Sequence, residues 1–127
     1  MPYRIEFLED KGIVLVESIG ELTYKEFVKE TQEAQELARK KNTRLFLSDC
    51  SRLIVKAGTL ELFDFPAMYQ RIGSPKTSKI AVLMSGDTTT DKDIRFYETV
   101  CQNRGWQVMA FMSRDEAVKW LLGGGGT

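Results

Sequence analysis

Three aspartates stand where a mainly parallel sheet would bring them to one edge: Asp49, Asp87 and Asp91. Carboxylate oxygens are the ligands that Mg²⁺ prefers, so these three side chains form a candidate metal site. A simpler interpretation is that Asp49 and Asp87 accept backbone hydrogen bonds in loops, while Asp91 caps or fronts a helix. We favour the simpler interpretation and predict no bound metal and no cofactor.

Cys50 follows a predicted buried strand, a position where a phosphatase nucleophile could lie. A C-x₅-R loop would need arginine at residue 56, but that residue is Lys56. We therefore interpret Cys50 as a small apolar core residue. The polar loop 85–90 offers hydroxyls beside a predicted helix start and could bind an anion, but it lacks the lysine and second glycine of a P-loop.

The composition excludes several functional classes. Histidine is absent, which removes the commonest general base and transition-metal ligand. Lys plus Arg and Asp plus Glu both number 18, so the chain lacks the positive excess typical of nucleic-acid binders. It has neither a signal-peptide pattern nor a run of 18 apolar residues. These features predict a cytoplasmic protein without a transmembrane segment and without a nucleic-acid partner.

The segment 60–69 carries apolar residues on two sides of a predicted helix. Its residues 60, 63 and 67 share one side, and its residues 62, 65 and 69 share another. A helix that is apolar on two sides needs two apolar neighbours. The segment is therefore either buried between the sheet and another helix, or it forms a partner surface or the wall of an apolar pocket.

Periodicity predicts the elements that position these residues. Strands are expected at 3–8, 13–16, 45–47, 80–84 and 106–111. Helices are expected at 23–41, at 59–72, from about 90 to 104 and at 113–122. Thr23, Thr59 and Ser113 are the expected N-caps, and Pro66 should kink or divide the second helix.

This order of elements predicts an α/β fold. The sheet should have five strands, mostly parallel, with the first strand pairing antiparallel in an N-terminal hairpin, and four main helices. The apolar run 13–16 should lie inside the sheet, flanked by 3–8 and 44–48. One domain should span residues 1–122, and the glycine-rich residues 123–127 should form a flexible tail, either native or left over from cloning.

Several strings resemble the SpoIIAA-like (STAS) superfamily, in particular its stand-alone bacterial branch. They are the opening hairpin, the strands 45–49 and 79–82, and the ending 108–121, in which a strand ends in Phe111 and is followed by a cap, Glu-Ala and Trp-Leu. The resemblance spans nearly the whole chain and implies a SpoIIAA-like fold. The stand-alone branch is also similar to CRAL-TRIO lipid-binding domains.

In this superfamily, anti-sigma-factor antagonists carry an acidic residue, two serines and a glycine where the helix after the third strand begins. Phosphorylation of one serine by a partner kinase switches partner binding. The corresponding stretch here is 57–60, in which Thr59 alone has a hydroxyl. The resemblance thus implies Thr59 as the candidate phosphoacceptor, whereas its sequence context predicts a helix N-cap.

Three hypotheses follow for the function. The first is a non-enzymatic regulatory module that binds a protein partner or itself through the region after the third strand. The second is binding or sensing of a small apolar or lipid-like molecule between the helix 59–72 and the sheet. The third is an enzyme that uses Asp49, Cys50 and Asp87. The residues expected to form the ligand or partner surface are Asp49, Ser51, Gly58, Thr59, Leu60, Phe63, Phe65, Met68, Tyr69, Ser85 and Asp87.

Overall fold

A computed structural model describes residues 2–123, in which five strands form one sheet in the order β1-β2-β3-β4-β5. β1 pairs antiparallel with β2, and the other neighbours are parallel, so the predicted α/β architecture is confirmed. The strands are β1 (Tyr3–Leu8), β2 (Ile13–Leu22), β3 (Leu45–Val55), β4 (Lys79–Leu83) and β5 (Gln107–Phe111). The helices are α1 (Tyr24–Lys40), α2 (Thr59–Phe63), α3 (Phe65–Ile72), α4 (Thr88–Asn103) and α5 (Arg114–Leu121).

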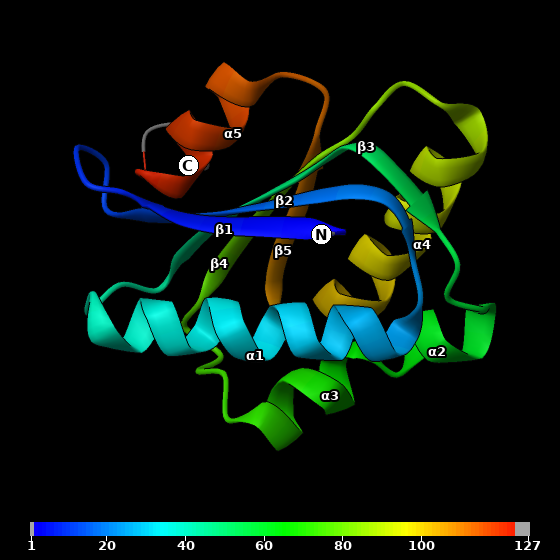
Figure 1. Cartoon of the computed structure of the whole chain (residues 1–127), viewed down its shortest axis with the longest axis horizontal. Helices are drawn as coiled ribbons and strands as arrows, with labels where there is room; N and C mark the ends of the chain where they lie inside the picture. The colour runs from blue at the N-terminus through cyan, green and yellow to red at the C-terminus, as the bar shows by residue number, and fades with distance from the viewer. Residues whose placement is uncertain (1, 124–127) are drawn as a thin grey trace.

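The helices divide unequally between the two faces of the sheet. α1, α2, α3 and α4 share one apolar core with the sheet, and α5 covers the opposite face (Figure 1). Side chains alternate between these layers along each strand. In β3, Leu47 packs with Trp120 of α5, whereas Phe46 packs with Ala34 of α1.

The position of β2 inside the sheet was predicted and is confirmed. β1 pairs with it on one side, from Tyr3 opposite Ser18 to Leu8 opposite Ile13, and β3 pairs with it on the other. Ile13 and Val14 have no exposed surface. A run that is apolar on consecutive residues suits this location because both faces of the sheet are covered.

β3 is longer than predicted. The polar string from Ser48 to Ser51 was expected to end the strand, but pairing with β2 continues to Val55. The register between β2 and β3 shifts once. Glu17 pairs with Asp49 and Ile19 pairs with Arg52, so β3 has one more residue than β2 between these two pairs. Backbone pairing with a long neighbouring strand outweighs the local polarity, so the predicted end of the strand at residue 47 was wrong.

The predicted helix 59–72 is divided into α2 and α3 at Asp64. Pro66 lies in the first turn of α3, where a missing backbone N–H costs no helical hydrogen bond. Gly73 ends α3 in the left-handed conformation with φ of 91°. The division expected from Pro66 is confirmed, and the two short helices, α2 and α3, run in different directions (Figure 1).

Helix starts were predicted with mixed success. Thr23 caps α1, and its backbone N–H donates to the Glu26 carboxylate over 2.8 Å, as the capping-box pattern predicted. α4 begins at Thr88 with Asp87 as its cap, earlier than the predicted start near Thr90 or Asp91.

No helix within residues 2–123 is long and apolar enough to cross a membrane. The predicted domain, 1–122, begins with a residue that lies outside the described ones. Of the predicted tail, residues 124–127 also lie outside them.

Candidate functional site

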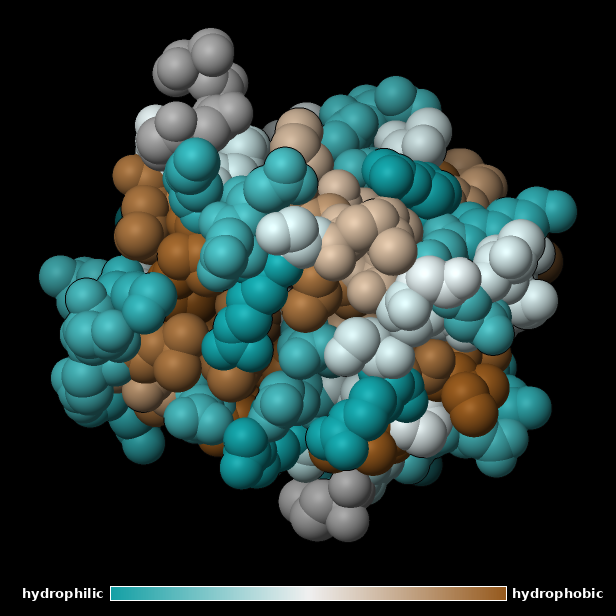
Figure 2. Space-filling view, turned by 90° about the horizontal axis from the view of Figure 1, so that it is seen from above, coloured by the Kyte–Doolittle hydropathy of each residue, from teal (hydrophilic) through white to brown (hydrophobic). Residues whose placement is uncertain are grey.

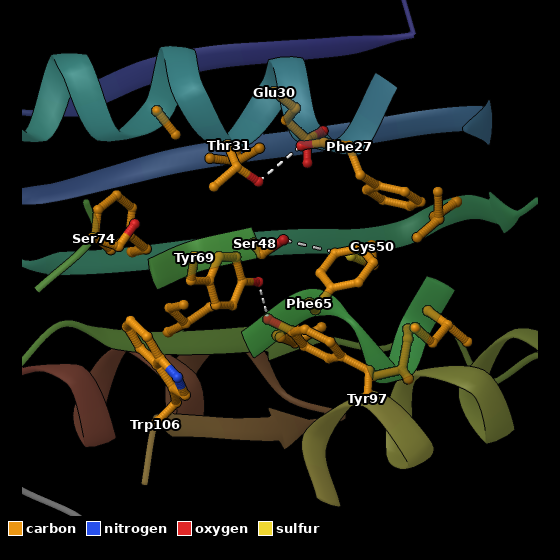
Figure 3. Close-up of a pocket in the computed structure, with 18 of the residues that line it drawn as sticks. Phe27, Glu30, Thr31, Ser48, Cys50, Phe65, Tyr69, Ser74, Tyr97 and Trp106 are labelled. Carbon is orange, nitrogen blue, oxygen red and sulfur yellow. Dashed lines mark hydrogen bonds between the residues drawn. The ribbon is translucent and has the colours of Figure 1, made fainter. Parts of the chain in front are cut away.

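A cavity of about 100 Å³ lies on the face of the sheet that α1, α2, α3 and α4 cover, between these helices and the strands. Figure 3 shows side chains from α1 on one side of it and Phe65, Tyr69 and Tyr97 on the other. The strands contribute alternate residues, such as Ile80 and Val82 of β4, because every second side chain points to this face. The residues that line it are Val16, Phe27, Glu30, Thr31, Ala34, Gln35, Phe46, Ser48, Cys50, Leu53, Val55, Leu62, Phe65, Tyr69, Ser74, Ser78, Ile80, Val82, Asp93, Ile94, Tyr97 and Trp106.

Phe65 is the centre of the aromatic wall of this cavity. Its ring centroid lies 5.5 Å from that of Phe27, 6.0 Å from that of Tyr69 and 5.3 Å from that of Tyr97, always edge to face. The Tyr69 and Tyr97 hydroxyls hydrogen-bond to each other, so both polar tips are satisfied within the wall (Figure 3). Burial raises the pKa of both phenols well above the usual value. The wall is therefore neutral, and its aromatic packing is worth more than burial of the same area alone.

Glu30 places a carboxyl group among these apolar side chains. Glu30 is only 6% exposed, and its Oε2 accepts a hydrogen bond of 2.7 Å from the Ser18 hydroxyl of β2. Burial raises the pKa of Glu30 to about 7, against the opposing effect of the Ser18 hydrogen bond, and the nearby Glu33 carboxylate raises it further. Glu30 is thus a buried acid that changes charge near neutral pH.

Ser78 supplies a second polar group. It lies just before β4 and is 2% exposed, and its Oγ has no hydrogen-bond partner among the described protein atoms. Ser74 lines the cavity as well. A buried hydroxyl without a partner is costly, and because this oxygen is closed to a water-sized probe it lies behind the cavity surface rather than on it.

Cys50 lines the cavity but is poorly suited to act as a nucleophile. It is 5% exposed, and burial raises its pKa to about 12, so the reactive thiolate is scarce at neutral pH. Its sulfur lies 3.5 Å from the Ser48 hydroxyl (Figure 3). This environment agrees with the interpretation of Cys50 as a core residue.

The expected ligand or partner surface is divided between two sides of the α2–α3 segment. Phe65 and Tyr69 line the cavity, whereas Leu60 is 85% exposed and Phe63 is 49% exposed. Met68 is 1% exposed and lines a separate groove beside α1 rather than the cavity. Within the α2–α3 segment, the cavity therefore lies under Leu62, Phe65 and Tyr69.

Thr59 does not cap α2. Gly58 is the N-cap, and its backbone N–H donates to Oε1 of Glu61 over 2.9 Å, while Thr59 is the first helical residue. Glycine is accepted at an N-cap, and the Glu61 carboxylate substitutes for the missing side chain of the cap. The predicted capping role of Thr59 was wrong. Its hydroxyl is exposed, and its role as a phosphoacceptor stays a prediction.

The candidate metal ligands each have local partners. Asp49 accepts from the backbone and hydroxyl of Ser51 at 3.0 and 2.6 Å, within β3 rather than in a loop. Asp87 caps α4 by accepting from the Thr90 N–H at 2.9 Å. Asp91 lies in the first turn of α4, as predicted, and also accepts from the backbone N–H of Ser85. Within residues 2–123, no three Asp, Glu, Cys or His side chains gather as a metal site would require.

Sequence reasoning missed Glu30 and Ser78. A signal for Glu30 existed, because it lies three residues after Phe27 and four before Ala34 on the predicted inner face of α1. Ser78 had none, since its burial follows from the return of the chain from α3 to β4.

Comparison with solved structures identifies the fold. The chain superposes with a TM-score of 0.61 on an uncharacterised DUF3478-family protein with a SpoIIAA-like fold from Shewanella loihica PV-4, at 18% identity and covering 94% of this chain and 91% of that one. The unphosphorylated anti-sigma factor antagonist SpoIIAA matches with a TM-score of 0.54 and 14% identity, covering 95% of this chain and 98% of SpoIIAA. The chain has the SpoIIAA-like (STAS) fold. The resemblance drawn from the sequence is thus confirmed for the fold of the chain.

No protein-family model and no curated protein matches the chain. At these identities, the likeness to the two structures concerns the fold alone, and the function of the chain has to be argued from its own residues.

Proposed function

We propose that this STAS domain is a non-enzymatic binding module that holds a small apolar molecule in the cavity between α1, α3 and the sheet. The observation that carries the proposal is the cavity itself, most of whose lining residues are aliphatic or aromatic. Protein interiors are normally packed to near-crystalline density. An unfilled space of about 100 Å³ among large side chains therefore lowers the stability of the fold, and a bound molecule that fills it would restore part of that stability.

Size and lining restrict the occupant to small molecules. An engineered apolar cavity of about 150 Å³ is known to take up benzene, so about 100 Å³ suits a molecule of similar or slightly smaller size. A longer chain would have to displace Phe65 or Tyr69, whose rings are held by several edge-to-face contacts. A dissociation constant on the order of 0.1–1 mM is expected for a simple probe of this size.

Thermal unfolding in the presence of benzene tests the proposal. Benzene at about five times its dissociation constant should raise the melting temperature by roughly 3–5 °C, because only the folded state offers the cavity. Ala34→Leu extends three more carbon atoms into the cavity and should abolish the shift. Gln32→Leu, on an exposed position of the same helix, should retain it. Equal shifts in all three proteins, or none in any, would contradict ligand binding in the cavity.

A second candidate function, contact with a protein partner or a second copy of the chain, is favoured by the surface of α2. Leu60 and Phe63 lie three residues apart and share one helix face, and both are exposed. Arg104 lies over the Phe63 ring at 5.3 Å, which adds a cation beside the apolar pair. Exposed aromatic and arginine side chains of this kind are typical of interface cores.

Quantitative affinity capture from the native cells tests this second function. Proteins captured by the wild type should be lost with the Leu60→Ser/Phe63→Ser double variant and kept with Leu122→Ser, which changes another exposed leucine, next to α5. Self-association is measured separately by sedimentation velocity. An unchanged set of captured proteins and an unchanged sedimentation coefficient would exclude the α2 surface as an interface.

A further inference from the structure

We propose that the molecule held in this cavity is a small neutral alcohol of about six non-hydrogen atoms or fewer, and that Glu30 and Ser48 bind its hydroxyl group. This inference rests on the proposed function. It adds the chemical class of the ligand and the two residues that select it.

The first argument is that one carboxyl oxygen of Glu30 is open to the cavity. Oε2 of Glu30 accepts the hydrogen bond from Ser18, whereas Oε1 accepts none from the described residues. Among these residues, the Ser78 hydroxyl is the one side-chain oxygen that is both sealed from water and without a partner. Oε1 of Glu30 is therefore not sealed. Since Glu30 lines the cavity, this oxygen can accept a hydrogen bond from a molecule inside it.

The second argument is the exposure of Ser48 in the middle of the sheet. Ser48 pairs with Val16 of β2 and Val82 of β4, which are 5% and 3% exposed, and all three line the cavity. Ser48 is nevertheless only half-buried, so its free surface faces the cavity. Among the described residues, its hydroxyl has one hydrogen-bonding contact, the Cys50 sulfur at 3.5 Å, and sulfur is a weak partner. The Ser48 hydroxyl thus keeps the capacity to bond a ligand.

Glu30 and Ser48 lie on the same side of the cavity, between α1 and β3. Figure 3 shows the Glu30 side chain extending from α1 toward β3, where Ser48 and Cys50 lie. Burial is the main cause of the raised pKa of Cys50, and the Glu30 carboxylate raises this pKa further, so the carboxyl group lies near this part of β3. One hydroxyl group between α1 and β3 can therefore meet both residues.

The third argument is the charge of the lining, which favours a hydroxyl over an ionic group. The described residues that line the cavity include no lysine or arginine, while Glu30 and Asp93 contribute carboxyl groups, so an anion would be desolvated without a cation to pair with. Burial raises the pKa of Glu30 to about 7, so near neutral pH this group is often protonated and pairs poorly with an ammonium ion. A hydroxyl donates to a carboxylate and accepts from a protonated carboxyl, so it can bond Glu30 in either state.

Cyclopentanol and benzene test this inference, because the two molecules have the same number of non-hydrogen atoms and only cyclopentanol has a hydroxyl. Ser48→Ala should weaken cyclopentanol binding about three- to tenfold and leave benzene binding unchanged or slightly tighter. Glu30→Leu should have the same selective effect, and Gln32→Leu, on an exposed position of α1, should affect neither probe. Dissociation constants are measured near pH 6 from the indole N–H resonance of Trp106, which lines the cavity. The resonance of Trp120, which packs under α5, is the internal control.

The outcomes of this experiment separate the two proposals. If neither probe shifts the Trp106 resonance, the proposed function fails. If benzene binds and cyclopentanol does not, or if Ser48→Ala changes both affinities by the same factor, ligand binding stands but the assignment of an alcohol is refuted. Should Glu30→Leu fail to fold, Ser48→Ala alone decides.

Two ions of the same size test the neutral class. Cyclopentylammonium and butanoate should leave the Trp106 resonance unshifted at the concentrations at which cyclopentanol saturates it, because the cavity lining pairs poorly with either charge. Tighter binding of either ion than of cyclopentanol would overturn the assignment of a neutral ligand.

Discussion

Glu30 lies on the inner face of α1 with its carboxyl group 6% exposed and bonded to Ser18. Its pKa of about 7 in the folded protein lies above the ordinary value of 4.5 because burial disfavours the charged form. The folded protein therefore keeps a proton that the unfolded chain releases as the pH rises above 4.5. The resulting stability is fully present below pH 4.5 and is lost by about pH 7.

Glu30→Gln should flatten this part of the stability curve. Wild-type protein should lose roughly 3 kcal/mol of unfolding free energy between about pH 4.5 and pH 7 through this group, at about 1.4 kcal/mol for each pKa unit. Urea denaturation across this range measures the difference in slope, and Glu36→Gln, on the exposed side of α1, is the matched control. Parallel curves for wild type and Glu30→Gln would refute the assignment.

The two cysteines should be protected from thiol reagents in the native protein. Cys50 and Cys101 are 5% and 0% exposed, and burial raises the pKa of each thiol to about 12. A disulfide reagent at pH 8 should label neither within the time in which it labels both in denaturant. Rapid labelling of Cys50 in the native state would revive the hypothesis of an enzyme that uses Asp49, Cys50 and Asp87.

At the scale of elements, the N-cap of α2 is Gly58 in the structure, whereas the sequence pattern predicted Thr59. Glu61→Ala should lower the unfolding free energy by about 0.5–1 kcal/mol, because the Gly58 N–H loses its carboxylate acceptor and the helix N-terminus loses a favourable charge. Thr59→Ala should change it by less than about 0.5 kcal/mol, since Thr59 is exposed and is not the cap. Denaturant titration of both variants gives the comparison, and the reverse order of effects would restore Thr59 as the cap.

Elements with regular apolar periodicity were predictable from the sequence, and those that depend on distant pairing were not. α1 followed from the capping pattern of Thr23 and Glu26, and the core strand β2 followed from its apolar run. The continuation of β3 through Asp49 and Ser51 could not be predicted, because its stability comes from β2, about thirty residues earlier in the chain. The cap of α2 was displaced by one residue because glycine and threonine are both accepted there.

The candidate site was less predictable than the fold. The two-sided apolar segment 60–69 indicated burial, a pocket wall or a partner surface, but which of its residues face inward depends on the division at Asp64. That division turns Leu60 and Phe63 outward while Phe65 and Tyr69 face the cavity. The aspartates were candidate metal ligands because of their residue type and their expected position at one edge of the sheet. Their local hydrogen bonds depend on the backbone geometry around them, which the sequence does not specify.

At the scale of the whole molecule, the two faces of the sheet differ in how they are covered. α5 alone covers one face around Ala117, Trp120 and Leu121, whereas four helices cover the other and leave the cavity between them and the sheet. Viewed from the α5 side, hydrophobic areas on the surface alternate with hydrophilic ones (Figure 2). The cavity thus lies in the helical layer that contains α2 and α3, the two short helices separated at Asp64.

A crystal structure of the protein grown with benzene tests the central claim, that this cavity is a binding site, most directly. We expect planar density within contact distance of Phe65, Tyr97 and Trp106, with the positions of α1 and α3 preserved, and no such density in Ala34→Leu. A cavity closed by the side chains of Phe65 and Tyr69, or benzene found on the surface of α2 beside Leu60 and Phe63, would contradict the claim.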